Sequence, residues 1–326
     1  MKAVFLDFDT LGPTDIDISP LTDQLPGLEL FPTTSKTQLL ERISAAEVIV
    51  INKVRLNDEA LRSARSLKLI CLVATGTDNV SLSSAGELGI AVCNIRDYCT
   101  PSVAQHVFAL MLALTHHLRE YETLVRKEAW MHSPQFCLLD FPIRELDGKT
   151  LGIVGFGSLG SRVARIAGAF GMKVLAARRP YSQQKFNDPS GDEDIERVSF
   201  DDLLSRSDVV SLHCPLGPET ENLINASTLQ IMRDDAILIN TARGGLIDSA
   251  ALVAALRTGQ IAGAGIDVLR QEPPADTDAI LEADLPNLIV TPHIAWAAQE
   301  SRQRAVNEIA ANIAAYRQGE NRNRVV

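Results

Sequence analysis

The sequence has no hydrophobic run long enough to span a membrane and no excess of positive charge. The most apolar helical stretch, residues 107–114, is far shorter than the roughly 20 residues that cross a bilayer. The amino-terminal MKAVFLDFDT carries acids within its apolar run and no small-residue cleavage site, unlike a signal peptide. Acidic residues number 41 against 31 lysines and arginines, a net charge of −10. This balance argues against nucleic acid and anionic membranes as partners.

Cysteine is sparse and shows neither a disulfide framework nor a metal site. The cysteines are scattered, odd in number and without a C-x-x-C pair, and no His/Cys cluster has zinc-like spacing. We therefore expect no metal, and reduced, mostly buried thiols in a cytoplasmic protein. The cysteines are Cys71, Cys93, Cys99, Cys137 and Cys214.

Length and periodicity favour two α/β domains with parallel sheets. A chain of 326 residues is about the limit for one core. Short apolar runs alternate with helical patterns throughout, which is typical of doubly wound sheets. Strands are predicted at 2–7, 48–51, 69–74, 90–93, 151–154, 172–177, 209–213, 236–240, 263–268 and 288–291. Helices are predicted at 35–44, 58–66, 84–88, 100–118, 158–170, 200–205, 225–232, 249–258 and 306–316, and a polar surface loop at 181–196.

The stretch at residues 149–179, KTLGIVGFGSLGSRVARIAGAFGMKVLAARR, reads as one βαβ unit. A buried strand leads into Gly155, Gly157 and Gly160, a G-x-G-x-x-G, and a helical pattern follows. In such a unit the first glycine permits a tight turn and the second lets the backbone approach a pyrophosphate. The third lets the helix and strand pack closely. The stretch therefore predicts a dinucleotide site with its phosphates on the helix N-terminus.

The end of the second strand in this unit indicates which dinucleotide is bound. A carboxylate about 20 residues beyond the glycines would bind the ribose 2′-hydroxyl of NAD. Arg178 and Arg179 stand there instead, with no acid nearby. Because a guanidinium can form paired hydrogen bonds with a phosphate, we expect NADP(H) to be preferred, with NAD(H) as the alternative. Two solvated arginines on a loop would be the structural alternative.

The loop at residues 74–80, ATGTDNV, follows a predicted strand at its carboxyl end, where open α/β sheets bind ligands. A glycine there lets backbone N–H groups approach an anion. The carboxylate of a small substrate would fit, although an ordinary turn has the same pattern.

Three side chains near strand ends in the second half suit the reduction of a 2-keto acid. Such a reaction needs a proton donor, and the imidazole of His293 exchanges its proton near neutral pH. A carboxylate on the other ring nitrogen, for which Glu272 is suited, would fix the ring and stabilise its charged form. Arg243 can bind both the carbonyl and the carboxylate of the acid.

The chain resembles the D-isomer-specific 2-hydroxyacid dehydrogenases. The matching stretches follow the family's order through most of the chain. They are ATGTDNV at 74–80, SVAQH at 102–106, ELDGKTLGIVGFGSLG at 145–160, SLHCPLGPET at 211–220, ILINTARGGLID at 237–248, GAGIDVLRQEPP at 263–274 and VTPHIAW at 290–296. Within the family, CNIRDYCTPSVAQH at 93–106 and HIAW at 293–296 are most similar to the glycerate dehydrogenase and hydroxypyruvate (glyoxylate) reductase branch.

The resemblance implies roles for particular residues. The catalytic residues would be Arg243, Glu272 and His293, and Asp267 would contact the nicotinamide amide. Substrate binding is implied for Thr75, Gly76, Thr77 and Trp296, together with Arg243 and His293. Cofactor contacts are implied for Gly155, Gly157, Ser158, Leu159, Gly160, Arg178, Arg179, Cys214, Pro215, Thr220, Thr241, Ala242 and Asp267.

The resemblance also implies a domain plan and a partner. Residues 1–102 with 294–326 would form a discontinuous substrate domain, and residues 103–293 a dinucleotide-binding Rossmann domain, with the active site in the cleft between them. Family members are typically homodimers joined through the cofactor domain. The less regular residues 119–147, which carry Trp130 and Phe136, could be an arm that packs against a second subunit.

Two other classes of function are weighed against a hydroxypyruvate or glyoxylate reductase. Asp7 and Asp9 resemble the D-x-D of haloacid-dehalogenase-type phosphatases, but Leu11 stands where that motif usually has Thr or Val. The second alternative is a dinucleotide-sensing, corepressor-like binding protein with little turnover.

Overall fold

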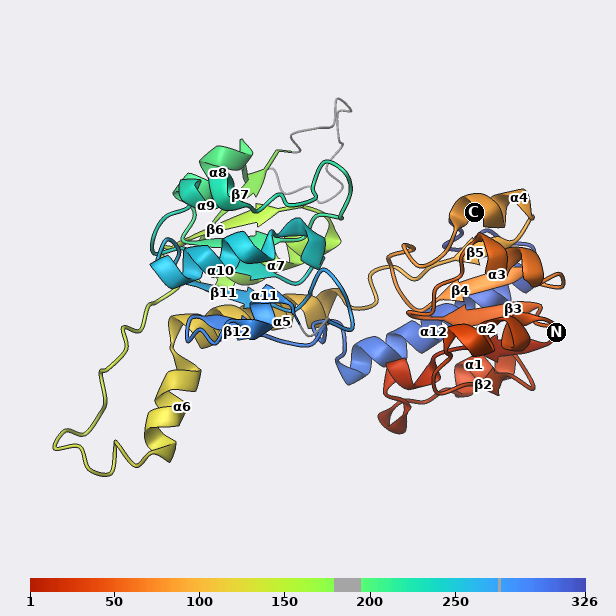
Figure 1. Ribbon diagram of the computed structural model, residues 1–326, viewed down its shortest axis with the longest axis horizontal. Coiled ribbons are helices and arrows are strands. Elements are labelled where there is room, and N and C mark those ends of the chain that lie inside the picture. Colours follow the sequence, from red (N-terminus) through yellow and green to blue (C-terminus); the bar gives the residue numbers. More distant parts are fainter. Residues whose placement is uncertain (179–194, 275–276) are drawn as a thin grey trace. The chain divides into compact units, whose positions relative to one another are not determined.

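The chain divides into two compact units in the computed structural model, which describes residues 1–178, 195–274 and 277–326 (Figure 1). Unit 1 comprises Met1–Cys99 and Trp296–Val326, and unit 2 comprises Thr100–Ala295. Each unit is built on one parallel sheet, with five strands described in unit 1 and seven in unit 2. The prediction of two parallel α/β sheets is therefore confirmed.

The sheet of unit 1 has the order β2-β1-β3-β4-β5, with every pair parallel. Apolar runs predict β1, β3, β4 and β5, whereas the edge strand β2 is too short to show a periodicity and was not predicted. The strands are β1 (Ala3–Phe5), β2 (Glu29–Leu30), β3 (Val48–Ile51), β4 (Leu69–Leu72) and β5 (Ala91–Cys93).

Helices cover both faces of this sheet, because successive strand residues point to opposite sides. Phe5 and Val50 pack on one face beneath α1 and α12, and Val4 and Ile49 pack on the other beneath α2, α3 and α4. The helices are α1 (Ser19–Gln24), α2 (Lys36–Ile43), α3 (Asp58–Ser63), α4 (Leu82–Glu87) and α12 (Gln299–Arg317), with short 3-10 turns η1 (Phe8–Leu11) and η2 (Pro13–Asp15).

The sheet of unit 2 has the order β12-β11-β10-β9-β6-β7-β8. The chain starts at the inner strand β6, continues to β7 and β8 on one side, and then crosses to β9 through β12 on the other. Parallel sheets bind ligands outside the strand ends at such a switch point. The strands are β6 (Thr150–Val154), β7 (Lys173–Ala177), β8 (Glu196–Val198), β9 (Val209–Leu212), β10 (Ile237–Asn240), β11 (Gly263–Ile266) and β12 (Leu288–Val290).

The helices of unit 2 also lie on both faces of the sheet. α5 and α7 cover the face with Ile153 and Ile239, and α8, α9 and α10 cover the face with Val210 and Leu238. The helices are α5 (Thr100–Thr115), α6 (Leu118–Arg126), α7 (Ser158–Ala169), α8 (Phe200–Arg206), α9 (Ala226–Ile231), α10 (Ser249–Thr258) and α11 (Ala279–Glu282), with the 3-10 turn η3 (Gly244–Leu246).

The long helix predicted through residue 118 is broken, and that prediction is wrong at its end. α5 stops at Thr115, and His117 has a left-handed backbone with φ of 49° before α6 begins at Leu118. The ring of His117 stacks on Phe141, 5.5 Å away, and the Tyr121 hydroxyl donates to the Phe141 carbonyl at 2.7 Å. Apolar periodicity continues across the break, so the sequence pattern does not reveal it.

α6 and the segment after it, residues 118–147, form an arm that projects from the rest of unit 2 (Figure 1). The arm exposes large apolar side chains to solvent: Phe136 is 90% exposed, Leu139 76% and Met131 74%. Apolar groups of this size in water are a signature of an interaction surface.

Two smaller predictions need correction. Of the loop expected at 181–196, residues 181–194 lie outside the described part of the chain, and Glu196 begins strand β8, which pairs with β7. Only Cys71 and Cys93 are buried, Cys99, Cys137 and Cys214 are half-buried, and none of these five described cysteines forms a disulfide. No helix in the described residues is long and apolar enough to cross a membrane.

Candidate active site

The glycine-rich turn joins β6 to α7 at the switch point of the unit 2 sheet. Gly155 has φ of +99°, which L side chains rarely adopt, and a Cβ there would lie 2.4 Å from the Cys214 nitrogen. A Cβ on Gly160 would lie 2.4 Å from the Gly155 carbonyl oxygen. Both glycines are therefore required by packing, since a side chain at either site would collide with backbone.

Gly157 differs from these two because, apart from its chain neighbours, no described residue has an atom within 4 Å of the place its Cβ would occupy. Gly157 is the N-cap residue of α7 and makes no side-chain cap, and both Gly157 and Ser158 are exposed. The turn thus presents backbone N–H groups to an open space at a helix N-terminus, which suits a pyrophosphate.

Residues around β9 and β10 complete this end of the sheet. Thr241, directly after β10, has a buried hydroxyl oxygen with no hydrogen-bond partner among the described residues. Such a group is costly unless something binds it, so Thr241 fits contact with a dinucleotide. Cys214 lies against Gly155, whereas the Thr220 hydroxyl is engaged within its own turn, with the Pro215 carbonyl at 2.8 Å. Leu159 and Ala242 are half-buried in the same unit.

Of the two arginines expected to select the cofactor, only Arg178 belongs to the described part of the chain. Arg178 is exposed and directly follows β7, and its backbone N–H donates to the Val198 carbonyl at 2.8 Å. Arg179 lies outside the described residues. A further cation, Arg197 on β8, places its guanidinium 4.3 Å from the ring centre of Phe156 in the glycine turn, and burial lowers its pKa. The sequence pattern gave no sign of Arg197, because only the pairing of β7 with β8 places it there.

His293 and Glu272 form the closest pair of candidate catalytic side chains. His293 Nδ1 lies 2.6 Å from Glu272 Oε2, with the two side chains 24% and 33% exposed. The other carboxylate oxygen, Oε1, accepts from the Leu269 backbone N–H at 3.0 Å. Glu272 is therefore oriented by the backbone and in turn orients the imidazole through Nδ1, so Nε2 takes no part in this pair.

Asp267 organises the segment that carries His293. It is 1% exposed and follows β11. Its Oδ1 accepts from the Thr291 hydroxyl at 2.5 Å and from the Ile294 N–H at 2.9 Å, and its Oδ2 accepts from the Ala295 N–H at 2.9 Å. The Asp267 carbonyl accepts from the His293 N–H at 2.7 Å. The carboxylate thus holds the Thr291 side chain before the turn at His293 and two backbone N–H groups after it.

His106 joins this cluster from α5, and reasoning from the sequence had assigned it no role in the site. Its Nε2 lies 3.0 Å from the Thr291 hydroxyl and 3.5 Å from Asp267 Oδ1. His106 lies within the SVAQH stretch that carries part of the resemblance, which was the available signal.

Arg243 lies on the neighbouring strand end. The buried Asn240 side chain bonds the Arg243 carbonyl and the Ala242 N–H, which shapes the turn after β10. A Cβ on Gly244 would lie 2.0 Å from the Leu269 carbonyl carbon, so this turn packs directly against the segment that leads to Glu272. Arg243 is half-buried and its Nη1 donates to the Ala242 carbonyl at 2.8 Å.

The remaining predicted substrate residues belong to unit 1. The Thr75 hydroxyl donates to the Ile95 carbonyl at 2.9 Å, and Asn94 donates to the Thr75 carbonyl at 2.8 Å. Among the described residues, the backbone N–H groups of Gly76 and Thr77 have no hydrogen-bond partner. Trp296 is half-buried against the unit 1 core, with its ring 6.4 Å from that of Tyr98.

Asp7 is not placed to act as a nucleophile. It is 4% exposed, and its carboxylate accepts the backbone N–H groups of Asn52, Lys53 and Val54 at 2.9, 2.6 and 2.9 Å. Both oxygens are committed to these bonds, so the geometry gives no support to the phosphatase alternative. Among the described residues, no group of three His, Cys, Asp or Glu side chains is arranged to hold a metal ion.

Comparison with known proteins identifies the family. The sequence model of the D-isomer specific 2-hydroxyacid dehydrogenase, NAD binding domain, matches residues 108–295. The chain belongs to the D-isomer specific 2-hydroxyacid dehydrogenases. It is therefore an oxidoreductase of this class, and the NAD-binding domain indicates a nicotinamide dinucleotide as its cofactor.

Relatives of this dehydrogenase align along nearly its whole length. The glycerate dehydrogenase of Methylorubrum extorquens is 43% identical over 322 residues, covering 99% of this chain and 98% of that protein. The hydroxypyruvate reductase of Blautia hydrogenotrophica is 38% identical, covering 98% of each. A crystal structure of D-lactate dehydrogenase from Aquifex aeolicus, complexed with NAD and lactic acid, has a TM-score of 0.82 and 33% identity, covering 98% of this chain and 96% of that one. The resemblance drawn from the sequence motifs is thereby confirmed.

Proposed function

We propose that this dehydrogenase reduces a small 2-keto acid, hydroxypyruvate or glyoxylate, to the D-2-hydroxy acid. The observation that carries the proposal is the 2.6 Å pair of His293 and Glu272 beside the strand ends of the NAD-binding unit. The relatives named glycerate dehydrogenase and hydroxypyruvate reductase support this choice of substrate.

The reaction divides into one hydride transfer and one proton transfer. The reduced nicotinamide, when bound, supplies the hydride to the keto carbon. His293 donates the proton on Nε2 to the carbonyl oxygen as that oxygen gains negative charge. The Glu272 carboxylate stabilises the protonated ring before this step and keeps the ring in place. Arg243 pairs with the carboxylate and polarises the carbonyl.

Substrate binding is assigned to both units. We assign unit 2 as the dinucleotide-binding domain and unit 1 as the substrate domain, near the expected boundaries of 103–293 and 1–102 with 294–326. The N–H groups of Gly76 and Thr77, with Thr75 shaping their loop, receive the substrate carboxylate. Trp296 bounds the substrate. Asp267 contributes through the His293 turn and contacts the nicotinamide amide.

NADPH is the proposed preferred cofactor. Arg178 stands at the end of β7, where NAD-specific members usually carry an acid, and Arg197 adds a second positive charge beside the glycine turn. A guanidinium attracts a 2′-phosphate, whereas a carboxylate would repel it. The remaining predicted contacts, Ser158, Leu159, Cys214, Pro215, Thr220, Thr241 and Ala242, belong to the same proposal.

Initial rates of reduced-nicotinamide oxidation with hydroxypyruvate, glyoxylate and pyruvate, each with NADPH and with NADH, test the proposal. We expect turnover with hydroxypyruvate or glyoxylate, faster with NADPH. Faster turnover with NADH would retain the reductase and contradict the cofactor assignment. An absence of turnover with every acid would contradict the reductase and favour a dinucleotide-sensing binding protein.

The role of Arg178 is tested by reversing its charge. Arg178→Glu should lower kcat/KM for NADPH by about 10- to 100-fold and leave that for NADH within about 3-fold, because only the 2′-phosphate meets the new charge. Arg257→Glu, an exposed arginine on α10, makes the same charge change as a control. If both variants act alike, Arg178 has no specific role.

We further propose that the enzyme is a cytoplasmic homodimer. The five cysteines, which form no disulfide, suit a reducing compartment, and the exposed apolar side chains of the arm suit a second copy of unit 2.

A further inference from the structure

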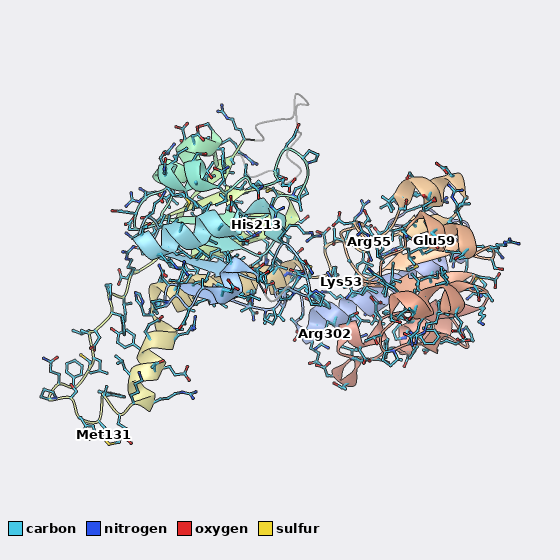
Figure 2. The ribbon with its side chains drawn as sticks, viewed as in Figure 1. Lys53, Arg55, Glu59, Met131, His213 and Arg302 are labelled. Atoms are coloured by element: carbon cyan, nitrogen blue, oxygen red, sulfur yellow. The ribbon has the colours of Figure 1, made fainter. Side chains whose placement is uncertain are left out.

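Two side chains, Asp7 and Asn79, hold the loop that follows β3, residues 52–56, which carries Lys53 and Arg55 (labelled in Figure 2). On one side the Asp7 carboxylate accepts the N–H groups of Asn52, Lys53 and Val54. On the other, Asn79 Nδ2 donates to the carbonyls of Asn52 at 3.2 Å and Val54 at 2.9 Å. Two side chains thus bind five backbone groups around one residue, Lys53, whose own side chain is exposed.

Asn79 connects this loop to the proposed carboxylate loop. β3 and β4 are parallel neighbours with Ile51 opposite Leu72, so both loops leave the sheet at the same edge. Asn79 ends the ATGTDN stretch that begins with Ala74, and its carbonyl accepts the Leu56 N–H at 2.8 Å. The position of residue 53 is therefore fixed relative to Gly76 and Thr77 within one unit.

Holding this loop requires the burial of the Asp7 carboxylate, which costs free energy. An ordinary surface turn forms without such a buried charge. A carboxylate that is 4% exposed loses its hydration, and three charge-assisted hydrogen bonds offset that loss. Rigidity of this kind matters where a side chain must meet one atom of a ligand, because a hydrogen bond weakens steeply with misalignment. These bonds fix the backbone of residues 52–54, from which the cationic side chain of Lys53 extends.

We propose that Lys53 is a specificity residue that binds the C3 oxygen of the substrate. The proposal rests on the proposed function, in which Gly76, Thr77 and Arg243 bind the carboxylate and carbonyl that all 2-keto acids share. Hydroxypyruvate differs from pyruvate by one hydroxyl on C3, and glyoxylate has no C3. An ammonium group donates a hydrogen bond to that hydroxyl, and a site built for a hydroxyl discriminates strongly against acids that lack one.

Replacement of the ammonium by a methyl thioether tests this role. Lys53→Met should lower kcat/KM for hydroxypyruvate by about 10- to 100-fold, mainly through KM, and change that for glyoxylate by less than about 3-fold. Lys53→Arg, which keeps the charge, should recover part of the loss. Arg55→Met removes the other exposed cation of the loop and should leave the ratio of the two substrates unchanged.

Equal losses for both substrates in Lys53→Met would show a general attraction of anions and overturn the proposal, as would no loss for either. Binding separates this outcome from failure of the reductase itself. Calorimetric titration of the wild type and Lys53→Met with D-glycerate and with D-lactate needs no turnover. A preference for D-glycerate that disappears in the variant supports Lys53 even if no keto acid is reduced, and equal binding of both acids by the wild type contradicts it.

Discussion

At the scale of single residues, the position of the His293 imidazole depends on its backbone conformation as well as on its side-chain contacts. It adopts a left-handed φ of 54°, which is unusual for a residue other than glycine. The Asp267 carbonyl and carboxylate hold the backbone in this turn, and Glu272 holds the ring. Strained conformations of this kind persist where surrounding bonds impose them, commonly at functional sites.

Replacement of His293 should therefore separate chemistry from cofactor binding. His293→Ala should lower kcat by about 100- to 10,000-fold, because the developing alkoxide loses its proton donor, while cofactor affinity changes little. Fluorescence titration with NADPH measures the affinity. His132→Ala, an exposed histidine of the arm, is the matched control and should retain full activity. An active His293→Ala enzyme would refute the assignment.

His213 provides a second residue-scale prediction, which concerns stability. Its Nδ1 is buried with no partner among the described residues, its Nε2 lies 2.8 Å from the Ser211 hydroxyl, and burial lowers its pKa from 6.5 to about 4. Between these values the unfolded chain binds a proton that the folded chain does not. The contribution of neutral His213 to the free energy of unfolding is therefore complete above pH 6.5 and is lost as the pH falls towards 4.

The free energy of unfolding should fall across this window by up to about 1.4 kcal/mol per pH unit on account of His213. Urea unfolding of the wild type and of His213→Gln at several pH values measures the effect, because glutamine does not titrate. We expect the two stability curves to converge as the pH falls. Parallel curves would mean that His213 is protonated alike in both states.

At the scale of elements, the ends of β1 and β3 are joined by Asp7. The first strand ends in a carboxylate that binds the loop of the next strand in the sheet, across 45 to 47 residues of sequence. The D-x-D pattern at Asp7 and Asp9 is thus explained by the architecture of unit 1. Asp9, two residues later, is exposed.

Removal of this carboxylate should destabilise unit 1. Asp7→Ala leaves three backbone N–H groups without their acceptor and should lower the free energy of unfolding by about 2–4 kcal/mol, and Asp7→Asn should act similarly. Asp9→Asn should have little effect. Denaturant unfolding monitored by fluorescence measures the difference. A stable Asp7→Asn protein that lost magnesium-dependent phosphate release would instead revive the phosphatase interpretation.

At the scale of the whole molecule, the arm exposes large apolar side chains that nothing in a single described chain covers. Trp130, Met131, Phe136, Leu139 and Ile143 are all more than half exposed, with Met131 labelled in Figure 2. Burial of such side chains on association contributes roughly 25 cal/mol per Å² of apolar surface, which favours a dimer.

The arm should therefore determine the oligomeric state. Sedimentation equilibrium of the wild type should give about twice the 35.4 kDa of one chain, and the double variant Met131→Ser, Phe136→Ser should dissociate more readily. A matched control, Leu40→Ser with Leu88→Ser, removes exposed apolar groups from unit 1 and should leave the mass unchanged. A monomeric wild type would contradict the proposal.

The sequence by itself determined the features that depend on local order. Apolar runs predicted most strands, since a strand buried on both faces by helices needs continuous apolar residues. The glycine turn could be predicted because its conformation depends on the spacing of glycines within a few consecutive residues. The motifs also named His293, Glu272 and Arg243, which sit at the ends of strands that periodicity can find.

Only the tertiary structure decided what depends on strand order and on long-range hydrogen bonds. Strand pairing brought Arg197 to Phe156, and the order of strands in unit 1 brought Asp7 to the loop at Lys53. The break at His117 follows contacts with the distant Phe141. Periodicity reports which side of an element is apolar, but it does not report which element lies beside it, and these roles depend on the neighbour.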